Sequence, residues 1–164
     1  MSLESVLDKV ASYHTKLVEV TGGEPLEHED VYPLMHALLD RDYAVMLETG
    51  GHVSISRVPE SVIKIIDIKT PDSKEADTFC WDNIPLAQPH DEFKFVICSR
   101  ADYEWSRNVM RERFAGLSNP ILFSPSHDEL SAQDLARWIL EDDLRVRLQL
   151  QIHKYIWGAT TRGV

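Results

Sequence analysis

The amino-acid sequence predicts an α/β fold with a mainly parallel sheet. Some segments repeat apolar residues at helical spacing, others are short and strand-like, and the two kinds alternate along the chain. The run Val62–Ile68 is almost continuously apolar, as expected for a strand that is covered on both faces. Alternation of strands and helices is typical of sheets built from β-α-β units.

Each expected element follows from its own pattern. Apolar residues mark one face of four helices: Leu3, Val6, Leu7 and Val10; Val31, Leu34, Met35, Leu38 and Leu39; Trp105 and Val109; Leu135, Trp138 and Ile139. Strand-like runs lie at Leu17–Val20, Ala44–Glu48, Val62–Ile68, Phe93–Cys98, Ile121–Phe123 and Val146–Gln151. The segment Pro71–Pro89 is expected to be an irregular surface excursion. Because a helix comes first, without the strand that a crossover helix normally follows, we expect the chain to begin within the fold.

Composition indicates a globular protein and excludes several classes. The 164 residues are 43% apolar and 27% charged, and they suffice for one compact domain. No apolar run approaches the roughly 20 residues of a membrane span, and the N-terminus lacks a secretory pattern, so we expect a cytosolic protein. The net charge of −10 argues against a nucleic-acid surface. Cys80 and Cys98, 18 positions apart, fit no zinc spacing and are expected to be reduced thiols.

Polar and glycine-rich segments follow the expected strands, where parallel sheets bind ligands. They are Thr21-Gly22-Gly23-Glu24-Pro25, Glu48-Thr49-Gly50-Gly51, Lys69-Thr70-Pro71, Ser124-Pro125-Ser126-His127 and Gln151-Ile152-His153-Lys154. Gly22 and Gly23 let a backbone approach a ligand closely, and Glu24 offers an acceptor, although a tight turn before a helix is an equal alternative. Glu48 either faces the mouth of the sheet or points to solvent.

The histidines do not indicate a metal site. Glu27-His28-Glu29-Asp30 and His36 have no spacing that brings ligands to one helix face. His153 is expected to close the last strand on the same face as Gln151, where paired donors and acceptors suit a flat heterocycle. A structural histidine is the alternative.

One family matches these motifs together. TGGEP after a strand resembles the motif that binds the amino group of S-adenosylmethionine (SAM) in radical SAM enzymes. Together with ETGG, DIKTPDS, KFVICSRADYEW, LFSPSH and QLQIHKYIWG, it resembles the 7-carboxy-7-deazaguanine synthases over essentially the whole chain. The resemblance implies an incomplete radical SAM partial (β/α) barrel. Gly50 stands where Ser or Asn is usual, and Asp72 and Lys74 where Gly is usual.

The resemblance also implies roles for individual residues. SAM would contact Gly22, Gly23, Glu24, Glu48, Asp67 and Lys69, and a pterin substrate would contact Thr21, Ser124, His127, Gln151 and His153. The implied lyase reaction converts 6-carboxy-tetrahydropterin into 7-carboxy-7-deazaguanine with loss of ammonia, toward queuosine. A 4Fe-4S cluster would cleave SAM to a radical, and Mg²⁺ would assist the ring contraction.

The same family pattern includes features that this sequence does not contain. The cluster-binding Cys-x3-Cys-x2-Cys loop and a nearby Asp-Thr for Mg²⁺ are expected upstream of Met1, so residues 1–164 are interpreted as one radical SAM-type domain without its first strand and cluster loop, inactive alone. A flavodoxin-type electron donor and a homodimer are implied by the family. Two alternatives stay open: a non-catalytic remnant that binds SAM or a pterin, and a flavodoxin-like binder that uses Gly22-Gly23 as an anion nest.

Overall fold

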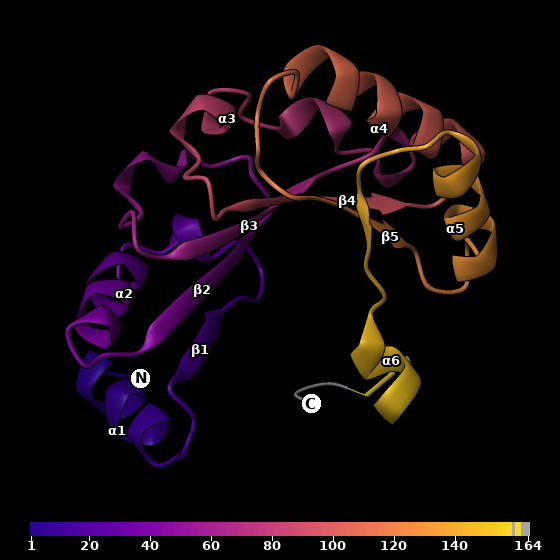
Figure 1. Cartoon of the computed structure of the whole chain (residues 1–164). Coiled ribbons are helices and arrows are strands. Elements are labelled where there is room, and N and C mark those ends of the chain that lie inside the picture. The colour runs from indigo at the N-terminus through magenta and orange to yellow at the C-terminus, as the bar shows by residue number, and fades with distance from the viewer. Residues whose placement is uncertain (159, 162–164) are drawn as a thin grey trace. The chain divides into compact units, whose positions relative to one another are not determined.

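The computed structural model describes residues 1–158, 160 and 161 (Figure 1). The chain divides into two compact units. The first unit comprises Met1–Asp67 and Thr78–Glu92, and the second comprises Ile68–Asp77 and Phe93–Val164.

The first unit is a three-stranded parallel sheet with its crossover helices. Its strands are β1 (Leu17–Val20), β2 (Ala44–Thr49) and β3 (Ile63–Ile68), and its helices are α1 (Leu3–Ala11), α2 (Val31–Leu39) and α3 (Asn83–Leu86), with 3-10 turns η1 (Pro25–Glu27) and η2 (Ile55–Arg57). Val18 lies opposite Val45, and Glu48 lies opposite Ile65, in parallel register. The crossover helix α2 buries Met35 and Leu38 completely or nearly so, because its apolar residues share one face. Figure 1 shows α1 and α2 beside β1 and β2.

A buried ion pair lies within the apolar strand β3. The prediction of a buried strand here is confirmed, and all its residues except the half-buried Ile63 are buried, including Lys64. Lys64 Nζ lies 3.1 Å from Asp91 Oδ2, and the two side chains are 2% and 0% exposed. Asp91 also accepts hydrogen bonds from the backbone amides of Lys64 and Gln88, at 2.8 and 2.7 Å. The pairing satisfies two charges that would otherwise be very costly to bury.

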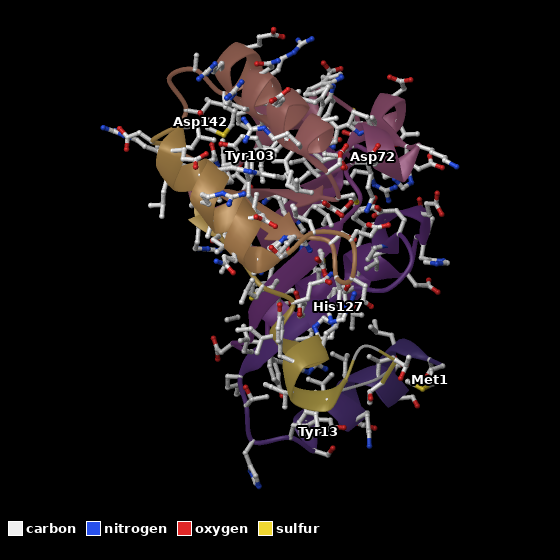
Figure 2. The ribbon with its side chains drawn as sticks, turned by 90° about the vertical axis from the view of Figure 1, so that its right-hand side faces the viewer. Met1, Tyr13, Asp72, Tyr103, His127 and Asp142 are labelled. Carbon is white, nitrogen blue, oxygen red and sulfur yellow. The ribbon has the colours of Figure 1, made fainter. Side chains whose placement is uncertain are left out.

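The second unit repeats the β-α-β pattern around an aromatic core. Its elements are η3 (Pro71–Ser73), β4 (Glu92–Ile97), α4 (Arg100–Arg113), β5 (Ile121–Pro125), α5 (Ala132–Glu141), β6 (Arg147–Leu148) and α6 (Ile152–Trp157), while η4 (Ala76–Thr78) lies where the two units meet in the sequence. Phe95 lies opposite Phe123 in parallel register, with ring centroids 5.5 Å apart. Tyr103, on α4, packs on Phe123 at 6.0 Å, and its hydroxyl donates to the Trp138 carbonyl and to Asp142 (Figure 2).

The expected last strand, Val146–Gln151, is wrong in its extent. Only Arg147–Leu148 forms β6, and Gln151 precedes the helix α6. After the amide of Gln149 bonds to the Phe123 carbonyl at 2.9 Å, the chain turns, with the Ile152 amide donating to the Leu150 carbonyl. Both residues of β6 are exposed, so little burial stabilises a longer strand. The segment Pro71–Pro89 contains only short helical turns, as an irregular excursion was expected to.

Candidate functional site

A glycine loop follows β1 in the first unit and presents its backbone to open space. Gly22 and Gly23 have φ of +96° and +57°, which favour glycine, and a Cβ on either would meet nothing within 4 Å. Neither amide has a hydrogen bond to another described residue. Glu24 ends the loop, and its carboxylate accepts the Leu26 amide at 3.0 Å at the start of η1. The loop therefore offers two amides that a ligand can approach.

A second glycine loop, Glu48–Gly51, follows the neighbouring strand β2. The half-buried Glu48 accepts a 3.3 Å hydrogen bond from the Thr21 hydroxyl of the first loop. Gly51 has φ of +72°, and a Cβ there would lie 2.8 Å from Phe79 Cδ2, so this glycine is required by packing. The buried side-chain amide of Asn83 stabilises the loop by donating to the Gly51 carbonyl at 3.0 Å.

The carboxylate of Glu24 joins the two loops. Glu24 is 8% exposed and accepts the Thr49 hydroxyl at 2.9 Å and the Gly50 amide at 2.8 Å. A Cβ at position 50 would lie 3.3 Å from Glu24 Oε2 and 3.3 Å from His52 Nδ1, so the glycine found here suits its crowded neighbours. Thr49 was not singled out as a site residue from the sequence, although it lies between Glu48 and the glycines at the end of a buried strand.

In the second unit, the loop after β3 is fixed by a buried carboxylate. Asp102, near the start of α4, is fully buried and accepts the Thr70 hydroxyl at 2.9 Å. It also accepts the amides of Asp72 and Cys98, each at 3.0 Å. Three donors from two segments thus bind one buried carboxylate, and these hydrogen bonds stabilise the Thr-Pro-Asp turn.

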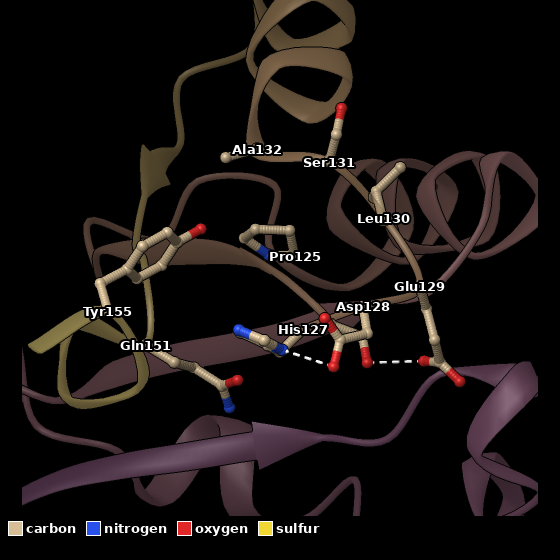
Figure 3. A pocket seen from close by; sticks show the side chains of 10 residues that line it. Pro125, His127, Asp128, Glu129, Leu130, Ser131, Ala132, Gln151 and Tyr155 are labelled. Carbon is tan, nitrogen blue, oxygen red and sulfur yellow. Dashed lines mark hydrogen bonds and ion pairs between the residues drawn. The ribbon is translucent and has the colours of Figure 1, made fainter. Parts of the chain in front are cut away.

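A pocket of about 380 Å³ lies at the carboxyl end of β5, within the second unit (Figure 3). Its lining consists of one loop, the start of α5 and two tail residues: Pro125, Ser126, His127, Asp128, Glu129, Leu130, Ser131, Ala132, Gln151 and Tyr155. The structure therefore brings together His127 and Gln151, two residues singled out in the sequence. Tyr155 was missed because the expected strand ended at Gln151, whereas the chain continues into the helix α6, which brings Tyr155 to the pocket.

Short polar contacts fix the side chains of this pocket. His127 Nδ1 lies 2.9 Å from Asp128 Oδ2, and Figure 3 shows the second ring nitrogen directed to the side where Gln151 and Tyr155 lie. Ser126 donates to Glu129 at 2.6 Å, and the Ser126 and Cys98 donors lower the pKa of the Glu129 carboxyl. Burial, followed by the bond to Glu129, raises the pKa of Cys98 to about 12, so its thiol is a donor and not a nucleophile at neutral pH.

Comparison with known proteins identifies the family. No family model matches the chain. The 7-carboxy-7-deazaguanine synthase of Koribacter versatilis is 45% identical over 90% of this chain and 72% of its own length. That of Chlorobaculum tepidum is 41% identical over 100% of this chain and 76% of its own length. The chain belongs to the 7-carboxy-7-deazaguanine synthase family. It therefore spans about three quarters of the length of these relatives.

Solved structures agree on the fold of this synthase-family chain. QueE from Escherichia coli matches with a TM-score of 0.74 at 20% identity, covering 92% of this chain and 64% of that one. Streptococcus suis SuiB bound to S-adenosylmethionine matches with a TM-score of 0.61 at 12% identity, covering 90% and 40%. The prediction of an α/β fold with a parallel sheet is thereby confirmed.

The remaining residues that were expected to bind a ligand lie outside both the glycine loops of the first unit and the pocket of the second unit. Ser124 is 1% exposed within β5 and precedes the pocket without lining it. Asp67 is buried in the first unit, and the half-buried Lys69 belongs to the second. His153 is exposed on α6 and absent from the pocket lining, so the expectation that it shares a strand face with Gln151 is wrong.

The described residues form no metal site. Among them no three or more His, Cys, Asp or Glu side chains gather closely enough to hold an ion. Cys80 belongs to the first unit and Cys98 to the second, and both are free thiols. Within the same residues, no helix has the length and apolar character needed to cross a membrane.

Proposed function

We propose that this chain supplies the SAM and pterin sites of the 7-carboxy-7-deazaguanine synthase reaction, the SAM-dependent conversion of 6-carboxy-tetrahydropterin into 7-carboxy-7-deazaguanine with loss of ammonia, and that these 164 residues are inactive alone. The observation that carries the proposal is the 45% and 41% identity to synthases over most of the chain. The loops at the strand ends support it, since they hold the side chains and open amides that such ligands need. No observation favours the flavodoxin-like alternative.

SAM is assigned to the glycine loops of the first unit. The open backbone of Gly22 and Gly23 suits the methionyl group of SAM, and Glu48 with Thr21 offers oxygens to ribose hydroxyls. Bound SAM supplies the radical chemistry, which no side chain here can provide. The part of the protein is to orient SAM and to keep its methionyl group in place. Asp67 of the same unit is proposed to line the same cofactor.

The pterin is assigned to the pocket of the second unit. Its volume of about 380 Å³ lies in the range of small-molecule sites. Gln151 can donate hydrogen bonds to the edge of a pterin and accept them from it, and the ring nitrogen of His127 that faces away from Asp128 can accept a hydrogen bond from a pterin N–H group. Tyr155 adds a flat apolar face for the heterocycle. Thr21, which lies in the first unit, and Ser124 and His153, which do not line this pocket, are not assigned to the pterin.

The iron–sulfur cluster and Mg²⁺ implied by the family do not fit the described residues, which contain two cysteines and no three-ligand group. We assign no residue of this chain to them. A flavodoxin-type donor, a homodimer, a cytoplasmic location and a role in tRNA queuosine formation are proposed on the family resemblance.

The test combines binding with turnover. SAM and 6-carboxypterin, a fluorescent oxidised analogue, should each bind the 164-residue chain, and neither should displace the other. A longer protein that adds cluster ligands should form 7-carboxy-7-deazaguanine from SAM, reductant and the pterin under anaerobic conditions, as detected by mass spectrometry. The 164-residue chain reconstituted with iron and sulfide should retain no stoichiometric iron, because it has two thiols. Absence of product from the longer protein would refute the proposal.

A further inference from the structure

Glu24 uses its hydrogen-bonding capacity within the protein. Oε1 accepts the Leu26 amide at 3.0 Å and the Thr49 hydroxyl at 2.9 Å. Oε2 accepts the Gly50 amide at 2.8 Å and the same hydroxyl at 2.9 Å. The carboxylate offers about four lone-pair sites and has three donors, because the single proton of the Thr49 hydroxyl is shared between the two oxygens. An ammonium group from a ligand would have to reach the remaining site or displace one of these donors.

The burial of Glu24 also restricts the access of a ligand to its carboxylate. The side chain of Glu24 is 5% exposed, so a ligand has little access to its oxygens. The imidazole of His52 lies beside the carboxylate, with Nδ1 3.8 Å from Oε2 of Glu24 and Nε2 3.3 Å from Glu27. In contrast, the residues directly before Glu24, Gly22 and Gly23, are exposed and face open space.

Thr49 completes the connection from the side of β2. It is 2% exposed, its hydroxyl donates to the Glu24 carboxylate, and the same oxygen accepts the Gly51 amide at 3.2 Å. The hydroxyl is thus satisfied both as donor and as acceptor. Because Glu48 precedes Thr49 directly, any movement of Thr49 also moves the carboxylate that receives the Thr21 hydroxyl.

We propose that Glu24 and Thr49 are positioning residues, which hold the two glycine loops in register for SAM without touching it. The inference rests on the proposed SAM site and deepens it. The open amides of Gly22 and Gly23 contact the cofactor. The Glu24 carboxylate, the Thr49 hydroxyl and the Gly50 amide form a buried brace, which fixes the positions of those amides and of Glu48. Removing either side chain of the brace loosens both loops together.

The experiment compares two ligands on the 164-residue chain by calorimetry. One is SAM, and the other is S-adenosyl-4-(methylthio)butanoate, which lacks only the α-ammonium group. The variants Glu24→Gln and Thr49→Val should each weaken both ligands by the same factor, about ten-fold, because a charge-assisted bond within the brace is lost. The double variant should bind no more than about two-fold worse than the weaker single variant, since both act through one connection. Thr49→Ser, which keeps the hydroxyl, should restore affinity.

Tyr103→Phe is the matched control, because it also removes a buried hydroxyl bound to a carboxylate, but in the second unit. It should lower the melting temperature and leave SAM affinity unchanged. Loss of SAM affinity with unchanged affinity for the deaminated ligand would show that Glu24 binds the ammonium, and would overturn the inference. Wild-type affinity in a folded Thr49→Val chain would overturn it too, and this variant carries the test if Glu24→Gln does not fold. A wild-type chain that binds neither ligand would instead refute the SAM site itself.

Discussion

The two candidate sites are built in different ways. In the first unit, the ligand-facing groups are the amides of Gly22 and Gly23, and the side chains that hold them, Glu24 and Thr49, are buried. In the second unit, the ligand-facing groups are the side chains of His127, Gln151 and Tyr155 around a defined cavity. A site made of backbone depends on conformation, whereas a site made of side chains depends on residue identity. The two should therefore respond to substitution in opposite ways.

The largest effect is expected where conformation and packing act together. Gly51→Ala places a Cβ against the Phe79 ring at a φ of +72°, so both strain and overlap destabilise the first unit. Gly116→Ala, at a φ of +85° with nothing within 4 Å, isolates the strain, which costs about 1–2 kcal/mol. We expect Gly51→Ala to cost at least about 2 kcal/mol more in the free energy of urea unfolding. Equal costs would mean that the Phe79 ring moves freely.

Substitutions in the two sites should weaken the two ligands separately. Gly23→Ala should weaken SAM by about ten-fold or more, because a φ of +57° is unfavourable for alanine, and should leave 6-carboxypterin binding unchanged. His127→Ala should do the reverse, weakening the pterin analogue by about ten-fold and sparing SAM. Calorimetry for SAM and fluorescence for the pterin analogue measure both. A variant that weakens both ligands equally would show that the sites are not separable.

A smaller effect is expected one contact away from the pterin. Asp128 lies 2.9 Å from His127 Nδ1 and is 81% exposed, so it orients the ring in a solvated setting. Asp128→Asn should weaken the binding of 6-carboxypterin by only about three-fold, because the amide oxygen can still accept the hydrogen bond from Nδ1–H of His127. Glu141→Gln, an exposed carboxyl on α5, is the control and should change nothing. A loss as large as that of His127→Ala would instead indicate that Asp128 touches the ligand.

Most of the strand and helix pattern could be predicted because burial enforces it. The apolar run at Val62–Ile68 had to be a covered strand, and the helical spacing of Val31–Leu39 had to bury one face. Prediction failed in the tail, where the same alternating residues allow a strand or a helix and neither becomes buried. That error also misplaced His153 and concealed Tyr155.

Most candidate residues could be found from the sequence, but it did not show which of them face a ligand and which hold the loops in place. Glycines and an acid after a strand indicate a ligand loop, yet nothing local shows that the Glu24 carboxylate is held by Thr49 and Gly50, which are 25 and 26 positions away. The same holds for Asp102, whose partner Thr70 is 32 positions away. Such contacts depend on the register of neighbouring strands, which a pattern of apolar residues leaves open.

The smallest predicted effect is a pH-dependent one, confined to the second unit. The Tyr103 hydroxyl, followed by Arg107, lowers the pKa of the Asp142 carboxyl below its ordinary value of 3.8. A depressed pKa means that the carboxylate stabilises the fold above pH 3.8 and that this stabilisation is lost as the pH falls through the lowered pKa. Tyr103→Phe removes the main cause, so its melting temperature should lie about 3 °C below wild type near neutral pH. The difference should shrink toward pH 2, about two units below the ordinary aspartate pKa. Calorimetric melts of both chains across this range provide the measurement. A difference that is constant with pH would show that the hydroxyl stabilises the unit through the Trp138 carbonyl alone, and not through the charge of Asp142.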